Sequence, residues 1–126
     1  MTTHHTSRSS YDNLGLAMLI SEPSGTPKGI VQIVHGMCEH KERYIPFMEY
    51  LSDAGYICII HDHRGHGESV ISEEDLGYMY KGGWQALVED IHSVRMEAEK
   101  MFPSLPYALI GHSMGSMAVR SYTKRY

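Results

Sequence analysis

A serine stands at the centre of the pentapeptide Gly111-His112-Ser113-Met114-Gly115, which has the form G-x-S-x-G. An apolar segment precedes it and a pattern of helical period follows it, so the serine falls at a strand-to-helix turn. The turn must be sharp to expose the hydroxyl, and a β-carbon at Gly111 or Gly115 would clash within it. The pentapeptide therefore predicts Ser113 as a catalytic nucleophile. The alternative is a Gly-Ser turn that opens an ordinary helix.

A second segment, His35-Gly36-Met37, could supply part of an oxyanion hole. It follows the apolar residues 30–34, at the strand end where α/β sheets place their ligand crevice. An oxyanion hole needs two backbone N–H groups, and those of Met37 and Met114 are the natural pair because Met114 begins a helix. Gly36 would let the backbone come close to a substrate carbonyl.

Three histidines, His61, His63 and His66, follow another apolar segment at a spacing that could suit zinc. The order resembles the H-x-H-x-D-H motif of metallo-β-lactamase-type hydrolases. However, Gly65 occupies the position of the motif's aspartate, and Asp62 is out of register with it. Zinc binding through these histidines is kept as an alternative, and we expect neither a metal nor another cofactor.

Strand-like and helix-like segments alternate along the chain and would position these groups. Short apolar runs typical of strands occupy residues 14–22, 30–34, 56–60 and 107–110, the first as a strand or part of a hairpin. Apolar residues at helical spacing extend from Tyr44 to Leu51, from Trp84 to Met101 and onward from Met114. Gly55 and Pro103 mark the ends of the first two helices.

This alternation predicts an α/β fold, with a mostly parallel sheet flanked by helices on both faces. We expect residues 1–13, which are largely polar, to be disordered or poorly ordered. Residues 14–126 would then form a single, partial domain.

The composition excludes several classes of function. Eleven Lys and Arg against 15 Asp and Glu give a formal net charge of −4, unlike a nucleic-acid-binding protein. No apolar run approaches the roughly 18 residues of a membrane span, and the N-terminus lacks the apolar core of a secretory signal. Cys38 and Cys58 form neither a CxxC motif nor a disulfide framework, so we expect a reducing, cytoplasmic location.

Three segments, in this order, resemble the monoacylglycerol lipase and lysophospholipase branch of the α/β-hydrolases, which is often grouped with the serine aminopeptidases. They are VHGMCEHKERY at 34–44, DHRGHGES at 62–69 and GHSMG at 111–115. The resemblance covers nearly the whole chain from about Leu14 onward. It implies a serine esterase that acts on a monoacylglycerol, a lysophospholipid or a similar small acyl ester.

The resemblance also implies roles for individual residues. Ser113 would be the nucleophile, and the N–H groups of Met37 and Met114 would form the oxyanion hole. Cys38 stands where many relatives carry a small residue, a departure that leaves the N–H of Met37 in place. His35 would hydrogen-bond within its own loop rather than replace the catalytic base.

Four further residues receive structural roles from the resemblance. Gly65 and Gly67 would shape the turns of the loop at 61–69, and Asp62 and Arg64 would tie that loop together.

The remaining members of a catalytic triad do not follow Ser113 in this chain. In α/β-hydrolases the acid and the histidine come after the serine, yet the 13 residues after Ser113 contain no Asp, Glu or His. A serine without an adjacent base is a weak nucleophile. We therefore expect this chain to form only the N-terminal part of the fold, truncated after the nucleophile elbow. We also expect it to be inactive alone.

Two consequences of this expectation concern stability and partners. The strand at 107–110 would be an exposed sheet edge, so the chain would be marginally stable. The edge would pair with a complementing C-terminal half or with a second copy. A non-catalytic remnant or interaction module remains the alternative function, and labelling of Ser113 by a fluorophosphonate would separate the two.

Overall fold

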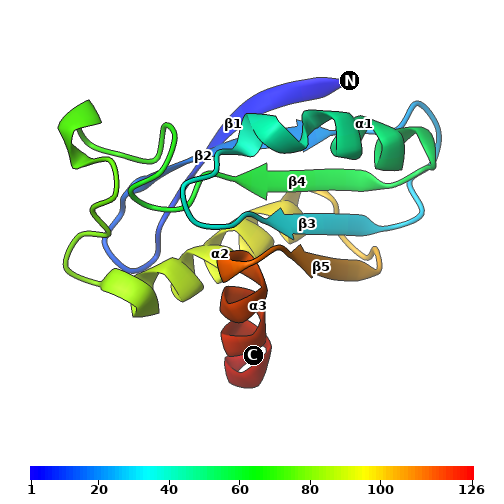
Figure 1. The fold of residues 1–126 in the computed structure, drawn as a ribbon. Helices are drawn as coiled ribbons and strands as arrows, with labels where there is room; N and C mark the ends of the chain where they lie inside the picture. The colour runs from blue at the N-terminus through cyan, green and yellow to red at the C-terminus, as the bar shows by residue number, and fades with distance from the viewer.

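The computed structural model describes all 126 residues, which form a five-stranded sheet with helices on both faces (Figure 1). The strands are β1 (Thr2–Arg8), β2 (Gly15–Ser21), β3 (Ile30–Val34), β4 (Ile57–His61) and β5 (Tyr107–Gly111). The helices are α1 (Ile45–Asp53), α2 (Gly83–Met101) and α3 (Met114–Arg125), with short 3-10 turns η1 (Lys41–Tyr44) and η2 (Glu73–Asp75). The α/β fold predicted from the sequence is confirmed.

The sheet is mixed, with the strand order β1-β2-β4-β3-β5. β3 lies in the centre of a parallel group, paired with β4 on one side and β5 on the other. β2 joins β4 in the antiparallel sense, and β1 joins β2 in the same way. The expected parallel arrangement therefore holds for β3, β4 and β5, and the N-terminal hairpin adds the antiparallel part.

Helix α1 covers one face of the sheet, and α2 and α3 cover the other (Figure 1). β3 contributes to both cores because alternate residues of a strand point to opposite faces. Val31 and Ile33 pack with Met48 of α1, whereas Val34 packs with the apolar residues of α2 and α3. All five residues of β3 are buried, as the continuous apolar run predicts for a strand covered on both sides.

The N-terminus differs from the sequence-based expectation. Residues Thr2–Arg8 are not disordered but form β1, which pairs along its whole length with Gly15–Ser21. The backbone alone supplies the hydrogen bonds of such a ladder, so an edge strand does not need apolar side chains. Hydroxyl groups also join the two strands, since the Oγ atoms of Thr2 and Ser21 lie 2.6 Å apart.

The other edge of the sheet is open at β5. The pattern of exposure alternates along this strand, with Ala108 and Ile110 exposed.

No helix of the chain has both the length and the apolar character required to cross a membrane.

Candidate active site

Ser113 occupies a sharp turn between β5 and α3, with φ 56° and ψ −120°. Such a conformation is strained for a residue with a side chain and is typical of functional turns. The two flanking glycines are required by contact. A β-carbon on Gly111 would lie 2.6 Å from the carbonyl oxygen of Gly115, and one on Gly115 would lie 2.1 Å from that of Val34. The turn thus exposes the Ser113 side chain at the carboxyl end of β5.

The loop after β3 lies directly against this turn. In the parallel ladder Val34 is the partner of Gly111, so the two strands end side by side. A β-carbon on Gly36 would stand 3.2 Å from the β-carbon of Ser113. It would also stand 3.2 Å from the carbonyl oxygen of His112, so a side chain at this position would crowd the turn and glycine favours the close approach.

The N–H groups of Met37 and Met114 donate no backbone hydrogen bond within the chain. Met114 is the first residue of α3, where N–H groups have no partner inside the helix. Both groups are therefore free to donate to an oxyanion near Ser113. Met37 is also exposed through its side chain, whereas Met114 packs into the core.

His35 controls the direction of the Met37 N–H. The fully buried ring donates from Nδ1 to the carbonyl oxygen of Gly36 at 2.7 Å and accepts at Nε2 from the N–H of His63 at 3.0 Å. The Gly36 carbonyl and the Met37 N–H belong to one trans peptide unit and point in opposite directions. The hydrogen bond that fixes the Gly36 carbonyl therefore also fixes the direction of the Met37 N–H.

His35 cannot act as a substitute base, because both ring nitrogens are occupied. Burial also lowers its pKa, which keeps the ring neutral. His112, the other histidine beside the serine, directs Nδ1 to a carboxylate oxygen of Glu39 at 3.3 Å.

Glu39 is a site residue that the sequence reasoning missed. Its Oε1 atom accepts hydrogen bonds from the N–H of Gly36 at 2.6 Å and from the hydroxyl of Tyr44 at 2.8 Å, besides that of His112. The signal available in the sequence was its position three residues after Gly36, where a side chain can reach back to the loop backbone.

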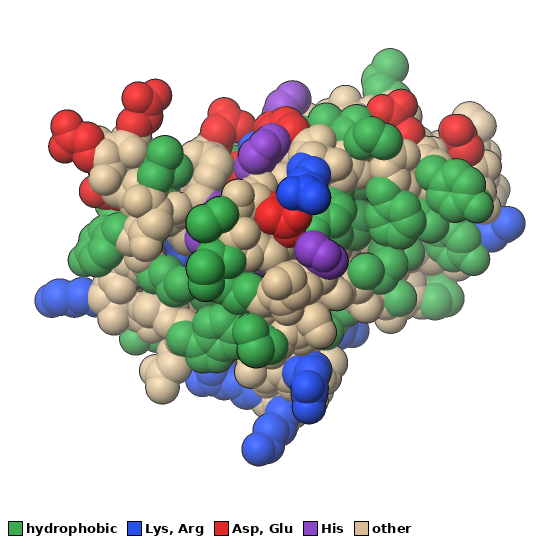
Figure 2. Space-filling view, in the orientation of Figure 1, with side chains coloured by type: hydrophobic (Ala, Val, Ile, Leu, Met, Phe, Trp, Pro, Cys, Tyr) green, Lys and Arg blue, Asp and Glu red, His purple; other side chains and the backbone are tan.

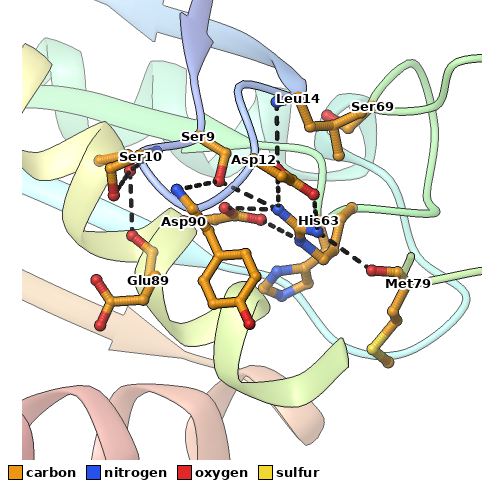
Figure 3. Close-up of polar contacts among 12 residues, drawn as sticks. Ser9, Ser10, Asp12, Leu14, His63, Ser69, Met79, Glu89 and Asp90 are labelled. Atoms are coloured by element: carbon orange, nitrogen blue, oxygen red, sulfur yellow. Dashed lines mark hydrogen bonds and ion pairs between the residues drawn. The ribbon is translucent and has the colours of Figure 1, made fainter. Parts of the chain in front are cut away.

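Arg64 joins three separate parts of the chain, and its partners Asp12, Met79 and Asp90 are labelled in Figure 3. Its guanidinium donates to the carboxylate of Asp90 in α2 at 2.7 and 3.1 Å, and to that of Asp12 in the β1–β2 turn at 2.9 and 2.9 Å. It also donates to Ser9 Oγ and to the carbonyl oxygen of Met79. The side chain is fully buried and every donor direction is used, so it holds the loop in place.

Asp62 ties the same loop to the segment after the Met37 loop. Its carboxylate accepts from the backbone N–H of Lys41 at 2.7 Å, from Lys41 Nζ at 2.8 Å and from the N–H of Glu68 at 2.9 Å. Burial alone would lower the pKa of Lys41, but hydrogen bonds to Asp62 and to two glutamates raise it instead. Lys41 is therefore a buried ammonium with full ionic compensation.

Gly65 and Gly67 have positive φ values of 74° and 50°. A β-carbon on Gly65 would lie 2.4 Å from the carbonyl oxygen of Tyr78, and one on Gly67 would lie 2.3 Å from the carboxylate of Asp62. Both positions combine a left-handed backbone with a close contact, so each requires glycine.

The zinc alternative finds no support in the positions of the histidines. No group of three or more His, Cys, Asp or Glu side chains in the chain is placed to hold a metal ion. His63 donates from Nε2 to the carbonyl oxygen of His35 at 2.8 Å, and His66 Nδ1 lies 3.1 Å from that of Arg64. The rings of His61 and His63 meet edge to face, with centroids 5.4 Å apart. The imidazoles are thus used for packing and backbone contacts.

A cavity of about 500 Å³ lies beside the Met37 loop, between residues 38–42 and the turns at 65–67 and 76–77. Ser113 is not among the residues that line it. Figure 2 shows that histidine, acidic and basic side chains form a narrow band in the middle of this face, with hydrophobic areas on either side. Met37, Leu76 and Tyr78 are among the exposed hydrophobic residues.

A G-x-S-x-G serine at the turn between a parallel strand and a helix, beside the loop of a neighbouring strand, is typical of the α/β-hydrolases. A profile of the family described as serine aminopeptidase, S33, matches residues 25–126, and the chain belongs to this family.

Curated relatives include monoglyceride lipases from several sources. The chain is 35% identical to monoglyceride lipase of Rattus norvegicus over 94 residues, which are 75% of this chain and 29% of that protein. It is also 35% identical to monoacylglycerol lipase of Mycolicibacterium smegmatis over 104 residues, 82% of this chain and 35% of that one. The chain thus spans about a third of the length of these relatives.

Solved structures show the same fold. A thermostable carboxyl esterase from Bacillus coagulans is 34% identical with a TM-score of 0.85, over 96% of this chain and 39% of that one. A lipase in its open form is 30% identical with a TM-score of 0.86, over 99% and 40% of the two chains. A monoglyceride lipase from Saccharomyces cerevisiae, 21% identical with a TM-score of 0.77, shares the fold over 99% of this chain and 40% of its own.

Proposed function

We propose that this chain supplies the nucleophile and the oxyanion hole for hydrolysis of a carboxylic ester, with a monoacylglycerol or a similarly small acyl ester as the substrate. The observation that carries the proposal is the placement of Ser113 at a strained, exposed turn beside two unpaired N–H groups, those of Met37 and Met114. The names of the related lipases support the choice of substrate class.

In the proposed reaction Ser113 Oγ attacks the carbonyl carbon of the ester. The negative charge that develops on the carbonyl oxygen is held by the two N–H groups, and such donors are worth about 3 kcal/mol each in the transition state. The serine proton must pass to a base, and both ring nitrogens of His35, the buried histidine of the neighbouring loop, are already engaged in hydrogen bonds. We therefore expect the 126-residue chain by itself to bind an acyl ester analogue and to turn over ester slowly or not at all.

The proposal is tested by a probe that needs no catalytic base. The boron of phenylboronic acid bonds to a serine oxygen while the hydroxyl proton passes to the solvent, and the anionic tetrahedral boronate that forms places one of its oxygens where the oxyanion would lie. In nitrogen-15 NMR spectra of the chain, we expect the amide signals of Met37 and Met114 to shift on addition of the probe. Ser113→Ala should abolish these shifts, whereas Ser121→Ala, a matched change further along α3, should leave them as they are.

A folded sample in which the probe shifts neither amide would contradict the proposal and favour a non-catalytic module. The substrate class is tested in the same spectra with a short-chain monoacylglycerol and a short-chain lysophospholipid, each below its aggregation concentration. Shifts around Ser113 with the monoacylglycerol support the stated class. Shifts with the lysophospholipid alone would replace it.

A further inference from the structure

The carboxylate of Glu39 lies between the two loops that carry the free N–H groups. Its Oε1 atom accepts from the N–H of Gly36 at 2.6 Å on one side and from His112 Nδ1 at 3.3 Å on the other. Gly36 directly precedes Met37, and His112 directly precedes Ser113. One carboxylate oxygen therefore bridges the loop after β3 and the nucleophile turn.

Glu39 is nearly buried, with its side chain 8% exposed. A carboxylate in such a place is stable only when its oxygens are compensated by donors or positive charge. Tyr44 donates its hydroxyl to Oε1 at 2.8 Å, and Arg43 lies 3.2 Å from Oε2. Burial raises the pKa of Glu39, but the hydrogen bonds from Gly36, Tyr44 and His112 outweigh it and lower this pKa to about 2.

The hydrogen bond from the Gly36 N–H to Glu39 is the second of two bonds that fix the backbone just before Met37. His35 holds the carbonyl oxygen of Gly36 at 2.7 Å, and Glu39 holds the N–H of the same residue at 2.6 Å. Because both polar groups of Gly36 are held, the loop cannot rotate its peptide planes without breaking a bond. A glycine has wide conformational freedom, so this position needs such restraint if the next N–H is to keep one direction.

We propose that Glu39 is the positioning residue of the oxyanion hole, and that its carboxylate holds the Met37 N–H against the nucleophile turn. This inference rests on the proposed function and adds to it the group that keeps one of the two oxyanion donors in place. The effect of Glu39 on the Met37 N–H would pass through Gly36, whose own N–H the carboxylate holds.

The test compares Glu39→Ala and Glu39→Gln with the unaltered chain, again by phenylboronic acid titration in NMR spectra. Hydrogen bonds to a charged group are strong, so we expect the dissociation constant of the probe to rise about tenfold in Glu39→Ala. Glu39→Gln keeps an acceptor oxygen without the charge, so its effect should be smaller. In both variants the amide signal of Gly36 should move upfield, and the signal of Met37 should broaden or divide.

Glu42→Ala is the matched control, since Glu42 lies three residues away and its carboxylate pairs with Lys41 at 2.9 Å. This variant should keep the affinity of the unaltered chain for the probe. Tyr44→Phe removes one donor from Glu39 and serves where Glu39→Ala does not fold. It should weaken probe binding by less than Glu39→Ala does.

A purely structural role for Glu39 would lower the free energy of unfolding and leave the affinity of folded protein for the probe unchanged. That result would overturn the proposal. If the unaltered chain binds no probe, the proposed function fails, and the role of Glu39 is then decided separately by the mobility of the Met37 amide. An equally rigid Met37 amide in Glu39→Ala and in the unaltered chain would overturn the positioning role as well.

Discussion

Gly115, in the first turn of α3, lies against the carbonyl oxygen of Val34 at the end of β3, and a β-carbon on it would stand 2.1 Å from that oxygen. The contact is between two backbones, so no flexible side chain can move away to relieve it. It arises because β5 lies beside β3 and α3 turns back across the end of that strand. The second glycine of the G-x-S-x-G motif thus sets how closely the turn at Ser113 approaches the loop of Met37.

Gly115→Ala should therefore destabilise the chain, although alanine is the better helix former by up to about 1 kcal/mol. Overpacking against a fixed backbone costs typically 1–3 kcal/mol, and we expect about 2 kcal/mol or more here. Urea unfolding followed by circular dichroism measures the difference. Gly25→Ala is the control, because a β-carbon there meets nothing within 4 Å. Equal stability of Gly115→Ala and Gly25→Ala would contradict the prediction that a β-carbon at Gly115 is obstructed by Val34.

Arg64→Lys should lower the free energy of unfolding by about 3 kcal/mol. Lysine keeps the charge but carries three donors on one nitrogen in place of the five of the guanidinium fork, so it cannot keep all the bonds to Asp12 and Asp90 and buried carboxylate oxygens lose partners. Denaturant unfolding of the two proteins at pH 7 measures the loss. Arg120→Lys, on the exposed face of α3, should change stability by less than about 0.5 kcal/mol. A loss below 1 kcal/mol in Arg64→Lys would argue against the buried network.

Stability should fall as the pH drops from about 6.5 toward 3. His61 is fully buried and neither ring nitrogen has a partner. Burial lowers its pKa from 6.5 to about 3. Between these values the unfolded chain binds the proton and the folded chain does not, so the stability present above pH 6.5 is lost on acidification. This histidine alone should cost about 2 kcal/mol at pH 5.

Burial lowers the pKa of His35 and His63 as well, so they add to the loss in the same direction. Glu39 does not contribute between pH 5 and 6.5, since its pKa changes from 4.5 to about 2. Unfolding at pH 7.5 and at pH 5 measures the dependence, which should be shallower in His61→Phe and unchanged in His4→Gln, an exposed position. If the free energy of unfolding depended equally on pH in His61→Phe and His4→Gln, the loss of stability could not be assigned to His61.

The open edge at β5 should make the chain self-associate as its concentration rises. Unpaired N–H and C=O groups on an apolar edge strand can pair with a second copy. Light scattering after size-exclusion chromatography should show the average mass increasing with concentration. Ala108→Lys, at an exposed position of β5, should reduce the association, and Thr6→Lys on the polar edge strand β1 should not. A monomer at all concentrations with a cooperative melt would contradict this prediction.

Local sequence patterns were sufficient to predict most of the strands and helices and the turn at Ser113. The apolar runs at 30–34, 56–60 and 107–110 correspond to β3, β4 and β5 within a residue at either end. The helix predicted up to Gly55 ends at Asp53, and Gly55 adopts a φ of 103°. These features depend on neighbours close in the chain, so residue type and spacing report them directly. The polar strand β1 carries no such pattern and was missed.

The sequence by itself determined that a serine would stand at a sharp strand-to-helix turn, because the two glycines and the flanking periodicities are local. Only the tertiary structure decided which groups surround it. Arg64 meets Asp90 and Asp12 across 26 and 52 positions of the chain, and Glu39 meets His112 across 73. Partners so far apart are set by the order of strands in the sheet, which no short stretch of residues encodes. A buried charge must find compensation, but the packed fold alone chooses the residue that provides it.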